Sequence, residues 1–431
     1  MSASAPVTNA TVDVLVIGAG PAGSVSAAVV HRAGLSVRVI EREQFPRFVI
    51  GESLLPRCME VLDDLDFLDA IRAKKFQEKF GAKFIRGDEV SDFNFSNQYT
   101  KGWTWTWQVP RAEFDQVLIQ EVERRGVPVA FQTTVERVEF LPDETSVVHV
   151  RNAEGVAETI RARFIIDSSG YGRVIPRQLG LDRPSTQDPR KAVFAHMLDP
   201  KRAEFDEPNR IVVVMFAPGV WTWVIPFSSG TTSVGFVGDI PYFARQGATT
   251  GEQFRALLAG HPYLRARFEG QPPIFEPRSL ESWSATTDKF YGPGYVLTGN
   301  VTEFLDPIFS SGVMFATVSA HLASSLVVSK LRGERPMDDS EWDREYTQVI
   351  RQGVDTFRTY VSKWYDGTLE TLFFAKDPPA DVTRKICSVL AGYVWDQSNP
   401  FVANHEAEVT RTARIIRAMA AGKIAAPVSQ Q

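Results

Sequence analysis

A glycine-rich loop near the start of the chain constrains the fold more than any other feature. The apolar, β-rich run at 12–17 is followed by Gly-Ala-Gly-Pro-Ala-Gly at 18–23, then by a helical pattern and a second apolar run that ends at Glu41. Strand, glycine loop, helix, strand and acid in this order are typical of a dinucleotide-binding unit, whereas the loop alone could be an ordinary turn. Such a loop holds a pyrophosphate and such an acid holds ribose hydroxyls, which predicts cofactor contacts from Gly18, Gly20, Pro21, Ala22, Gly23 and Glu41.

Two later segments favour FAD over NAD as this dinucleotide. The strand pattern at 161–167 runs into Asp167, and residues 294–313 have the pattern of a strand, a loop and a helix start. FAD extends further than a single nucleotide unit, so distant segments of the chain must return to it. The helix that begins near Ser311 would direct its free N–H groups at an anion or at the flavin ring.

Composition excludes several classes of function. The chain has 431 residues, 44% of them hydrophobic and 23% charged, with a formal net charge of −5, so we expect a soluble protein that binds no nucleic acid. The two cysteines, Cys58 and Cys387, and six scattered histidines predict neither a disulfide framework nor a metal site, and fit the cytoplasm. The apolar run at 12–20 continues into the glycine loop, so we expect no targeting segment there and no membrane span in the chain.

Five motifs in order along the chain resemble those of the flavin-dependent halogenases, a branch of the aromatic hydroxylase-like flavoproteins. They are GAGPAG at 18–23, GESLLP at 51–56, KFGA at 79–82, WTWVIP at 221–226 and FLDPIFSSGV at 304–313. The resemblance implies an α/β fold with an FAD-binding Rossmann-like lobe, an inserted mixed or antiparallel β-sheet and a C-terminal helical lobe. It also implies FAD contacts from residues at matching positions, namely Ser53, Arg111, Asp167, Asn300, Asp306, Gly312 and Val313.

The resemblance also implies a reaction. In this family reduced FAD and oxygen give a flavin hydroperoxide, which chloride or bromide attacks to form hypohalous acid. A lysine then relays the halogen to an electron-rich aromatic ring. One short segment contains four lysines, Lys74, Lys75, Lys79 and Lys83. The ordinary interpretation of each is a charged side chain on a solvent-exposed face. The KFGA match selects Lys79 as the relay, with Lys83 as the alternative.

A tryptophan motif occurs twice, at 105–110 and at 221–226. The resemblance selects the second copy, Trp221, Trp223, Ile225 and Pro226, as the block that separates the flavin from the organic substrate, although two core tryptophans in a strand remain an alternative. The first copy leads into Arg111 and an amphipathic helix. Its aromatic residues are expected to pack in a sheet, with one side facing the substrate.

Ser311 and Gly312 match the family segment whose backbone N–H groups hold halide, and consecutive N–H groups at a helix start form an anion site. Two positions depart from the family pattern. Phe309 stands where tryptophan halogenases have a glutamate, which favours a phenol or pyrrole as the substrate. Asn300 stands where related hydroxylases have an aspartate, and an asparagine can still bond a ribityl hydroxyl.

The chain divides into three predicted parts: an FAD-binding lobe at 1–80, 110–180 and 285–330, a substrate-side β-sheet at 81–109 and 181–284, and a C-terminal helical lobe at 331–431 that closes the aromatic pocket. A single dinucleotide unit predicts that a separate flavin reductase supplies reduced FAD. The substrate could be free or tethered to a carrier protein. An aromatic monooxygenase of the same fold, or a flavoprotein like geranylgeranyl reductase, are the alternatives.

Overall fold

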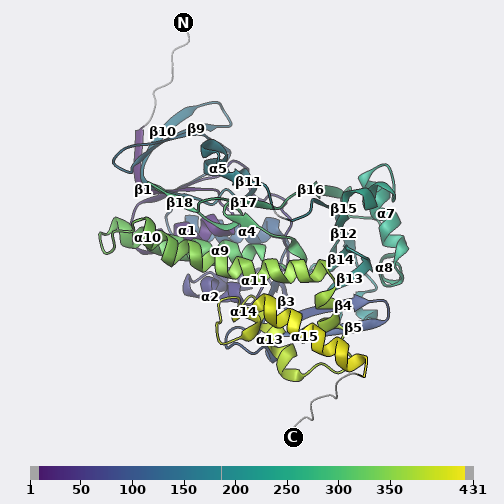
Figure 1. Cartoon of the computed structure of the whole chain (residues 1–431). Helices are drawn as coiled ribbons and strands as arrows, with labels where there is room; N and C mark the ends of the chain where they lie inside the picture. Colours follow the sequence, from purple (N-terminus) through teal and green to yellow (C-terminus); the bar gives the residue numbers. More distant parts are fainter. Residues whose placement is uncertain (1–8, 186, 423–431) are drawn as a thin grey trace.

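The computed structural model describes residues 9–185 and 187–422 and contains two large sheets (Figure 1). The first has eight strands, in the order β18-β19-β10-β1-β2-β7 with β9 paired to β10 and β8 to β9. Its strands are β1 Asn9–Ile17, β2 Val37–Ile40, β7 Val129–Ala130, β8 Thr133–Phe140, β9 Ser146–Asn152, β10 Ala157–Asp167, β18 Tyr291–Gly292 and β19 Tyr295–Leu297. The parallel pairing of β1 with β2 and β10 is the dinucleotide-binding arrangement predicted above.

Alternation along β1 explains why this sheet is covered on both faces. Val14 and Val16 pack among the helices α1 Pro21–Arg32, α4 Arg111–Arg124 and α9 Gly312–Leu331, whereas Leu15 and Ile17 pack in a second cluster with the β8–β9 hairpin. Successive side chains of a strand point to opposite faces, so an unbroken apolar run such as VLVI is typical of a strand between two layers.

The second large sheet has seven strands in the order β16-β12-β15-β14-β13-β4-β5. They are β4 Gly81–Arg86, β5 Glu89–Asn94, β12 Arg190–Leu198, β13 Ile211–Ala217, β14 Val220–Pro226, β15 Thr231–Asp239 and β16 Arg278–Glu281. One face carries Trp221, Trp223 and Ile225 toward the first sheet. The other is covered by α6 Ile240–Ala244, α7 Thr250–Gly260 and α8 Pro262–Phe268. Figure 1 shows α7 and α8 standing apart from the other helices.

Short elements link the two large sheets. Strands β3 Gln77–Lys79 and β6 Thr106–Gln108 form a two-stranded sheet, and each lies in the chain between a strand of one large sheet and a strand of the other. A three-stranded sheet contains β11 Asp182–Arg183, β17 Ala285–Thr287 and β20 Glu303–Phe304. The remaining early helices are α2 Arg57–Asp64, α3 Leu68–Ala73 and α5 Val174–Leu179.

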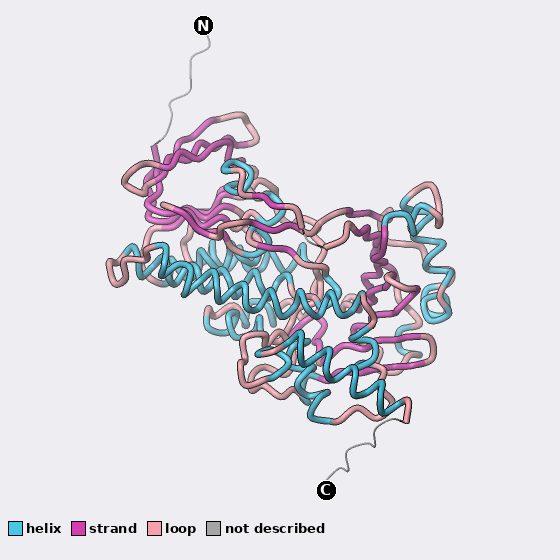
Figure 2. Tube along the Cα trace, viewed as in Figure 1, coloured by secondary structure: helices cyan, strands magenta, loops and turns pink. Residues whose placement is uncertain are grey.

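The C-terminal region is helical, as predicted, and it packs against the rest of the molecule (Figure 2). It contains α10 Asp339–Trp342, a π-helical turn at Asp343–Thr347, α11 Gln348–Tyr365, α12 Thr368–Phe373, α13 Ala380–Leu390, α14 Pro400–Ala403 and α15 His405–Ala420. Of the helices within 9–185 and 187–422, only α9 is long and apolar enough to span a membrane, and 67% of its most apolar window is buried inside the protein. Its packing against α1 and α2 gives α9 the environment of a core helix.

Candidate functional site

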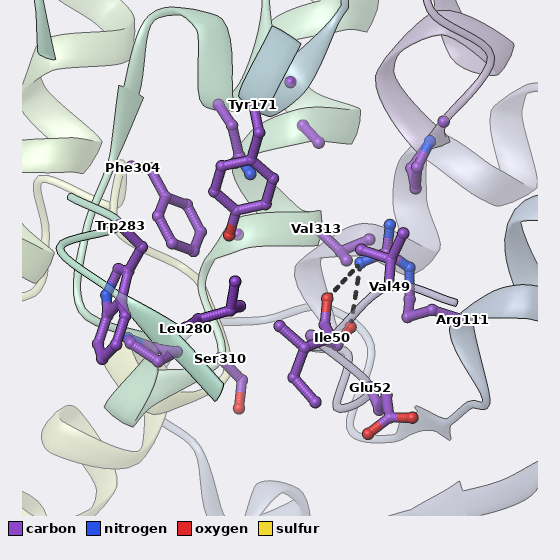
Figure 3. Close-up of a pocket in the computed structure, with 18 of the residues that line it drawn as sticks. Val49, Ile50, Glu52, Arg111, Tyr171, Leu280, Trp283, Phe304, Ser310 and Val313 are labelled. Atoms are coloured by element: carbon purple, nitrogen blue, oxygen red, sulfur yellow. Dashed lines mark hydrogen bonds between the residues drawn. The ribbon is translucent and has the colours of Figure 1, made fainter. Parts of the chain in front are cut away.

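A cavity of about 700 Å³ lies where the two large sheets meet (Figure 3). It extends from the glycine loop, past the segment that follows β10, to the tryptophan face of β14 and the start of α9. Cofactor and ligand pockets occupy roughly 300–1,000 Å³. Thirteen of the predicted site residues line this one cavity: Gly18, Gly20, Pro21, Ala22, Glu41, Ser53, Arg111, Trp221, Trp223, Ile225, Asn300, Gly312 and Val313.

The glycine loop has the geometry that a bound pyrophosphate requires. Gly18 has φ +98°, and a Cβ atom at Gly23 would lie 1.8 Å from the Gly18 carbonyl oxygen, so neither position accepts a larger residue. No side chain caps the N-terminus of α1, which leaves its N–H groups to a ligand. Gly23 itself lies outside the cavity, where it allows the close packing of helix on strand.

Glu41 fixes the shape of this loop. Its Oε2 accepts a 2.8 Å hydrogen bond from the Ala19 N–H and its Oε1 a 2.8 Å bond from the Glu43 N–H, while the side chain borders the cavity. Both carboxylate oxygens keep further lone pairs for a ribose hydroxyl.

Arg111 forms the opposite side of this end of the cavity. Its guanidinium makes a two-point ion pair with Asp115, at 2.7 and 2.9 Å, and donates to the carbonyls of Ile50 and Gly51 (Figure 3). Arg47 joins the same Asp115 carboxylate at 3.1 Å and also lines the cavity. Two cations on one buried carboxylate leave this three-residue cluster with one positive charge, which suits a phosphate group.

The start of α9 contains the segment whose backbone N–H groups are predicted to hold halide. Ser310 has φ +58° and lines the cavity, and so do Gly312 and Val313, whereas Ser311 is buried behind them as the N-cap residue. No side chain caps α9, so the N–H groups of its first turn remain available. Gly312 is therefore in position to contact a small anion, and Ser310 is a lining residue that the sequence analysis did not select.

The second tryptophan copy faces this end of the cavity. Trp221, Trp223 and Ile225, which we call the tryptophan wall, line it from alternate positions of β14. The indole N–H of Trp223 donates to Ser233 at 3.0 Å and that of Trp221 to Tyr365 at 2.9 Å. Both rings are thereby fixed, since a buried indole is stable only when its N–H has an acceptor. Pro226 lies beyond the cavity.

The first tryptophan copy does not line the cavity, but it contacts the second copy. Gln108 donates from its side-chain amide to the Pro226 carbonyl at 2.6 Å. In the adjoining ladder, Thr106 pairs with Lys79 and Trp107 with Glu78. The first copy therefore supports both the tryptophan wall and the strand that carries Lys79, which extends its predicted packing role.

Lys79 is buried, with only 3% of its surface exposed, and it lies behind Ser53. Its Nζ donates to the Ser53 Oγ and to the Leu54 carbonyl, each at 2.8 Å, while Ser53 lines the cavity. Burial lowers the pKa of the Lys79 ammonium to about 7. At neutral pH a substantial fraction of Lys79 is therefore a free amine.

Lys83 lies elsewhere. It belongs to β4, pairs in register with Val212 and forms a 3.0 Å ion pair with the exposed Asp206. Val212 faces the α7–α8 side of the seven-stranded sheet, away from the cavity. The geometry therefore favours Lys79 over its alternative.

Asp306 and Asp167 are buried but do not line the cavity. Asp167 accepts from the N–H groups of Ser169 and Ile175 and so shapes the turn after β10. Asp306 accepts from the Ile308 N–H and from the Tyr365 hydroxyl, at 3.1 and 3.0 Å. Burial raises the pKa of the Asp306 carboxyl to about 6. Both side chains hold cavity-lining segments in place through backbone N–H groups.

The C-terminal helix α11 packs against residues that line or support the cavity, although no residue of α11 lines the cavity itself. Tyr365 of α11 joins the Trp221 indole to the Asp306 carboxylate, and the Arg190 guanidinium lies 3.5 Å from the centre of its ring. Phe309 packs against three aromatic rings of α11, those of Phe357, Tyr360 and Trp364. The position that departs from the tryptophan halogenases is thus filled by a buried aromatic contact.

Sequence reasoning missed several lining residues. Glu52 stands inside the GESLLP motif, so its neighbour Ser53 could have pointed to it, and its Oε1 lies 2.7 Å from the His196 Nε2. Tyr171, Trp283 and Phe304 also line the cavity, with Tyr171 and Phe304 in edge contact (Figure 3). Phe304 stands inside the FLDPIFSSGV motif, so that motif could have pointed to it, whereas no sequence signal identified Tyr171 and Trp283, which distant segments bring to the cavity. Within the part of the chain that the structure describes, no group of three metal-ligating side chains gathers.

The chain is similar to one family model and to several known proteins. Residues 11–285 match the family model described as FAD binding domain. The chain is 27% identical over 390 residues to 1H-pyrrole-2-carbonyl-(peptidyl-carrier protein) chlorinase of Pseudomonas fluorescens, covering 85% of this chain and 86% of that one. It is 28% identical over 336 residues to the corresponding brominase of Pseudoalteromonas luteoviolacea, covering 77% and 79%.

A solved structure is more similar still. The crystal structure of a flavoprotein/dehydrogenase from Cytophaga hutchinsonii superimposes with a TM-score of 0.92 at 51% identity, covering 95% of this chain and all of that one. The structure of CmlS, a flavin-dependent halogenase, gives a TM-score of 0.74 at 27% identity and covers 96% of this chain and 78% of that one. The expected fold is confirmed.

Proposed function

Because the chain belongs to the FAD-binding domain family and is a flavin-dependent halogenase, we propose that it halogenates a phenol or a pyrrole through Lys79. The observation that carries this proposal is the contact of the buried Lys79 amine with Ser53, a residue of the cavity lining. The similarity to known halogenases supports flavin-dependent halogenation of an aromatic or pyrrole substrate. The relay through Lys79 and the preference for a phenol or a pyrrole are what we propose in addition.

The residues around the cavity fit FAD: a glycine cradle, two arginines on one carboxylate and an uncapped helix start. Bound reduced FAD supplies the oxygen activation that converts halide into hypohalous acid. Gly312 and the first turn of α9 hold the halide through backbone N–H groups. Holding the halide close to the activated oxygen supplies much of the rate of halide oxidation. The tryptophan wall keeps an organic ring away from the activated oxygen.

Lys79 then carries the halogen. Its amine nitrogen bonds the halogen of hypohalous acid, the oxygen–halogen bond breaks, and hydroxide leaves as water with one amine proton. The aromatic ring takes the halogen from nitrogen and gives up its ring proton, which restores the amine. We propose that the ring binds on the side of Lys79 remote from the cavity, near the half-buried Trp103 and Trp105.

The partners follow from the same proposal. A separate flavin reductase supplies reduced FAD. The substrate is free or tethered to a carrier protein, and the two pyrrole relatives are named for a carrier-tethered substrate. We propose the cytoplasm as the location of the enzyme. We also propose the three-part division of the chain given by the sequence.

The test is a reaction with flavin reductase, NADH and bromide, in which a panel of phenols and pyrroles is analysed by mass spectrometry. We expect products with the paired isotope masses of bromine. An increase of one oxygen mass, independent of halide, would instead identify an aromatic monooxygenase.

A further inference from the structure

Glu52 presents a carboxylate oxygen that the fold does not use. The residue is 1% exposed, and among residues 9–185 and 187–422 its Oε2 has no hydrogen-bond partner. Buried polar atoms of native proteins are almost always bonded, so an unpartnered carboxylate oxygen in a cavity lining indicates a ligand that donates to it.

The other oxygen of Glu52 is held in place by His196. The Oε1 lies 2.7 Å from the Nε2 of His196, which follows Phe194 on the cavity-facing side of β12. The rings of Phe48, Phe227 and Phe275 surround the imidazole, with centroids 5.1–5.7 Å away. An imidazole so enclosed can hold the carboxylate in one orientation, with Oε2 as the oxygen that has no partner.

Glu52 stands at the end of the cavity where halide chemistry is proposed. Figure 3 shows Glu52 and Ser310 on either side of the lower end of the drawn lining. The next residue along the chain is Ser53, whose hydroxyl contacts Lys79. Glu52 and its neighbour Ser53 therefore both line the cavity, and Ser53 connects this part of the lining to the Lys79 amine.

We propose that Glu52 binds the O–H group of hypohalous acid through Oε2 and turns its halogen toward Lys79, with His196 as the residue that positions Glu52. This inference rests on the proposed function. Hypohalous acid has a single hydrogen-bond donor, its O–H, so a lone acceptor oxygen fixes the oxygen end and leaves the halogen free to meet the amine.

The test uses the full-length, FAD-loaded enzyme with flavin reductase, NADH, bromide and a phenol or pyrrole that the wild type brominates. For each variant we would measure bound FAD, hypobromite released to a soluble scavenger, and brominated product. For Glu52→Gln we expect bound FAD to be unchanged, released hypobromite to rise several-fold and product to fall at least tenfold. Glu78→Gln, which removes an exposed carboxylate beside Lys79, is the matched control and should behave as wild type.

His196 provides a second, independent variant. His196→Gln keeps an N–H donor and should restore most of the product yield, whereas His196→Phe keeps the ring and removes the donor and should resemble Glu52→Gln. Loss of bound FAD in Glu52→Gln would assign the free oxygen to the cofactor and overturn the proposal. If Glu52→Gln gives the same ratio of brominated product to released hypobromite as the wild type, the proposal is also overturned.

The same measurements separate this proposal from the proposed function. If the wild-type enzyme forms no hypobromite and no brominated product, the halogenation proposal fails and the role of Glu52 fails with it. If the wild type brominates while Glu52→Gln and His196→Phe are unaffected, only the role of Glu52 is lost.

Discussion

The Nζ atom of Lys79 lies 2.8 Å from the Oγ atom of Ser53, which itself lines the cavity. A single hydroxyl group therefore connects a buried amine to the cavity lining. This contact is why the proposed relay is assigned to Lys79.

Replacement of Lys79 by alanine should abolish halogenation and leave FAD binding and hypohalous acid formation intact. The relay step has no substitute, so the loss should exceed the two- to threefold effect of an ordinary surface change by orders of magnitude. Mass spectrometry of the product, with a scavenger assay for hypohalite, measures both effects. Lys83→Ala, on the other side of the sheet, is the control and should retain activity; product from Lys79→Ala at a near wild-type rate would contradict the relay.

Halogenated product per flavin reoxidised should rise with pH around 7. The pKa of Lys79 is about 7, so the reactive amine is the minor form at pH 6 and the dominant form at pH 8. For one such group the neutral fraction increases roughly tenfold over this range. A yield that falls through the same range would show that the ammonium, and not the amine, handles the halogen.

Folding stability should also depend on Lys79. Because burial lowers its pKa from 10.5 to about 7, the unfolded chain binds a proton between these values that the folded chain does not. Stability attributable to this group therefore rises with pH across that window, by about 2 kcal/mol from pH 7 to pH 9. Denaturant titrations of wild type and Lys79→Met at both pH values test this, since the stability advantage of the methionine variant should shrink at pH 9.

Gly312→Pro should keep the protein folded and oxygen-consuming but divert reduced flavin to peroxide. Gly312 is the first residue of α9, a position where helices tolerate proline, so the substitution removes one N–H donor in the cavity while it adds a Cβ atom 3.3 Å from Phe304. Peroxide release and halogenated product are measured together with bound flavin. Gly312→Ala, which keeps the N–H, is the control, although its Cβ would meet Phe304 at 3.3 Å. Retained flavin with unchanged product and halide dependence would show that halide binds elsewhere.

Tyr365→Phe should destabilise the protein and loosen the coupling of flavin oxidation to halogenation. The substitution removes the acceptor of Trp221 and one donor to Asp306, both of which are buried. Unpaired buried groups cost about 1–3 kcal/mol each. Thermal unfolding and the ratio of peroxide to product measure the effect, and unchanged values for both would show that the hydroxyl has no role in the site.

The sequence was most informative where several residues must meet one local requirement. The strand, the glycine loop and Glu41 were predicted because a dinucleotide-binding unit lies within one short stretch of chain, and the start of α9 was predicted from the strand, loop and helix pattern at 294–313. The sequence did not show that the side chain of Ser310 lines the cavity while that of Ser311 is buried, since only the backbone turn decides which of two adjacent serines faces the cavity. Glu52 and His196 lie far apart in the sequence, so neither local pattern contains their contact.

The amino-acid sequence by itself determined the dinucleotide-binding unit, the succession of family motifs and the helical C-terminal region, because these depend on local periodicity and on glycines with little conformational choice. Only the tertiary structure decided which tryptophan copy faces the cavity, which lysine is buried beside Ser53 and which residue of α11 fixes Trp221. Each of these depends on strand pairing and on burial between distant segments. The register of a strand assigns every side chain to one of two faces, and burial, rather than residue type, sets the reactivity of a lysine.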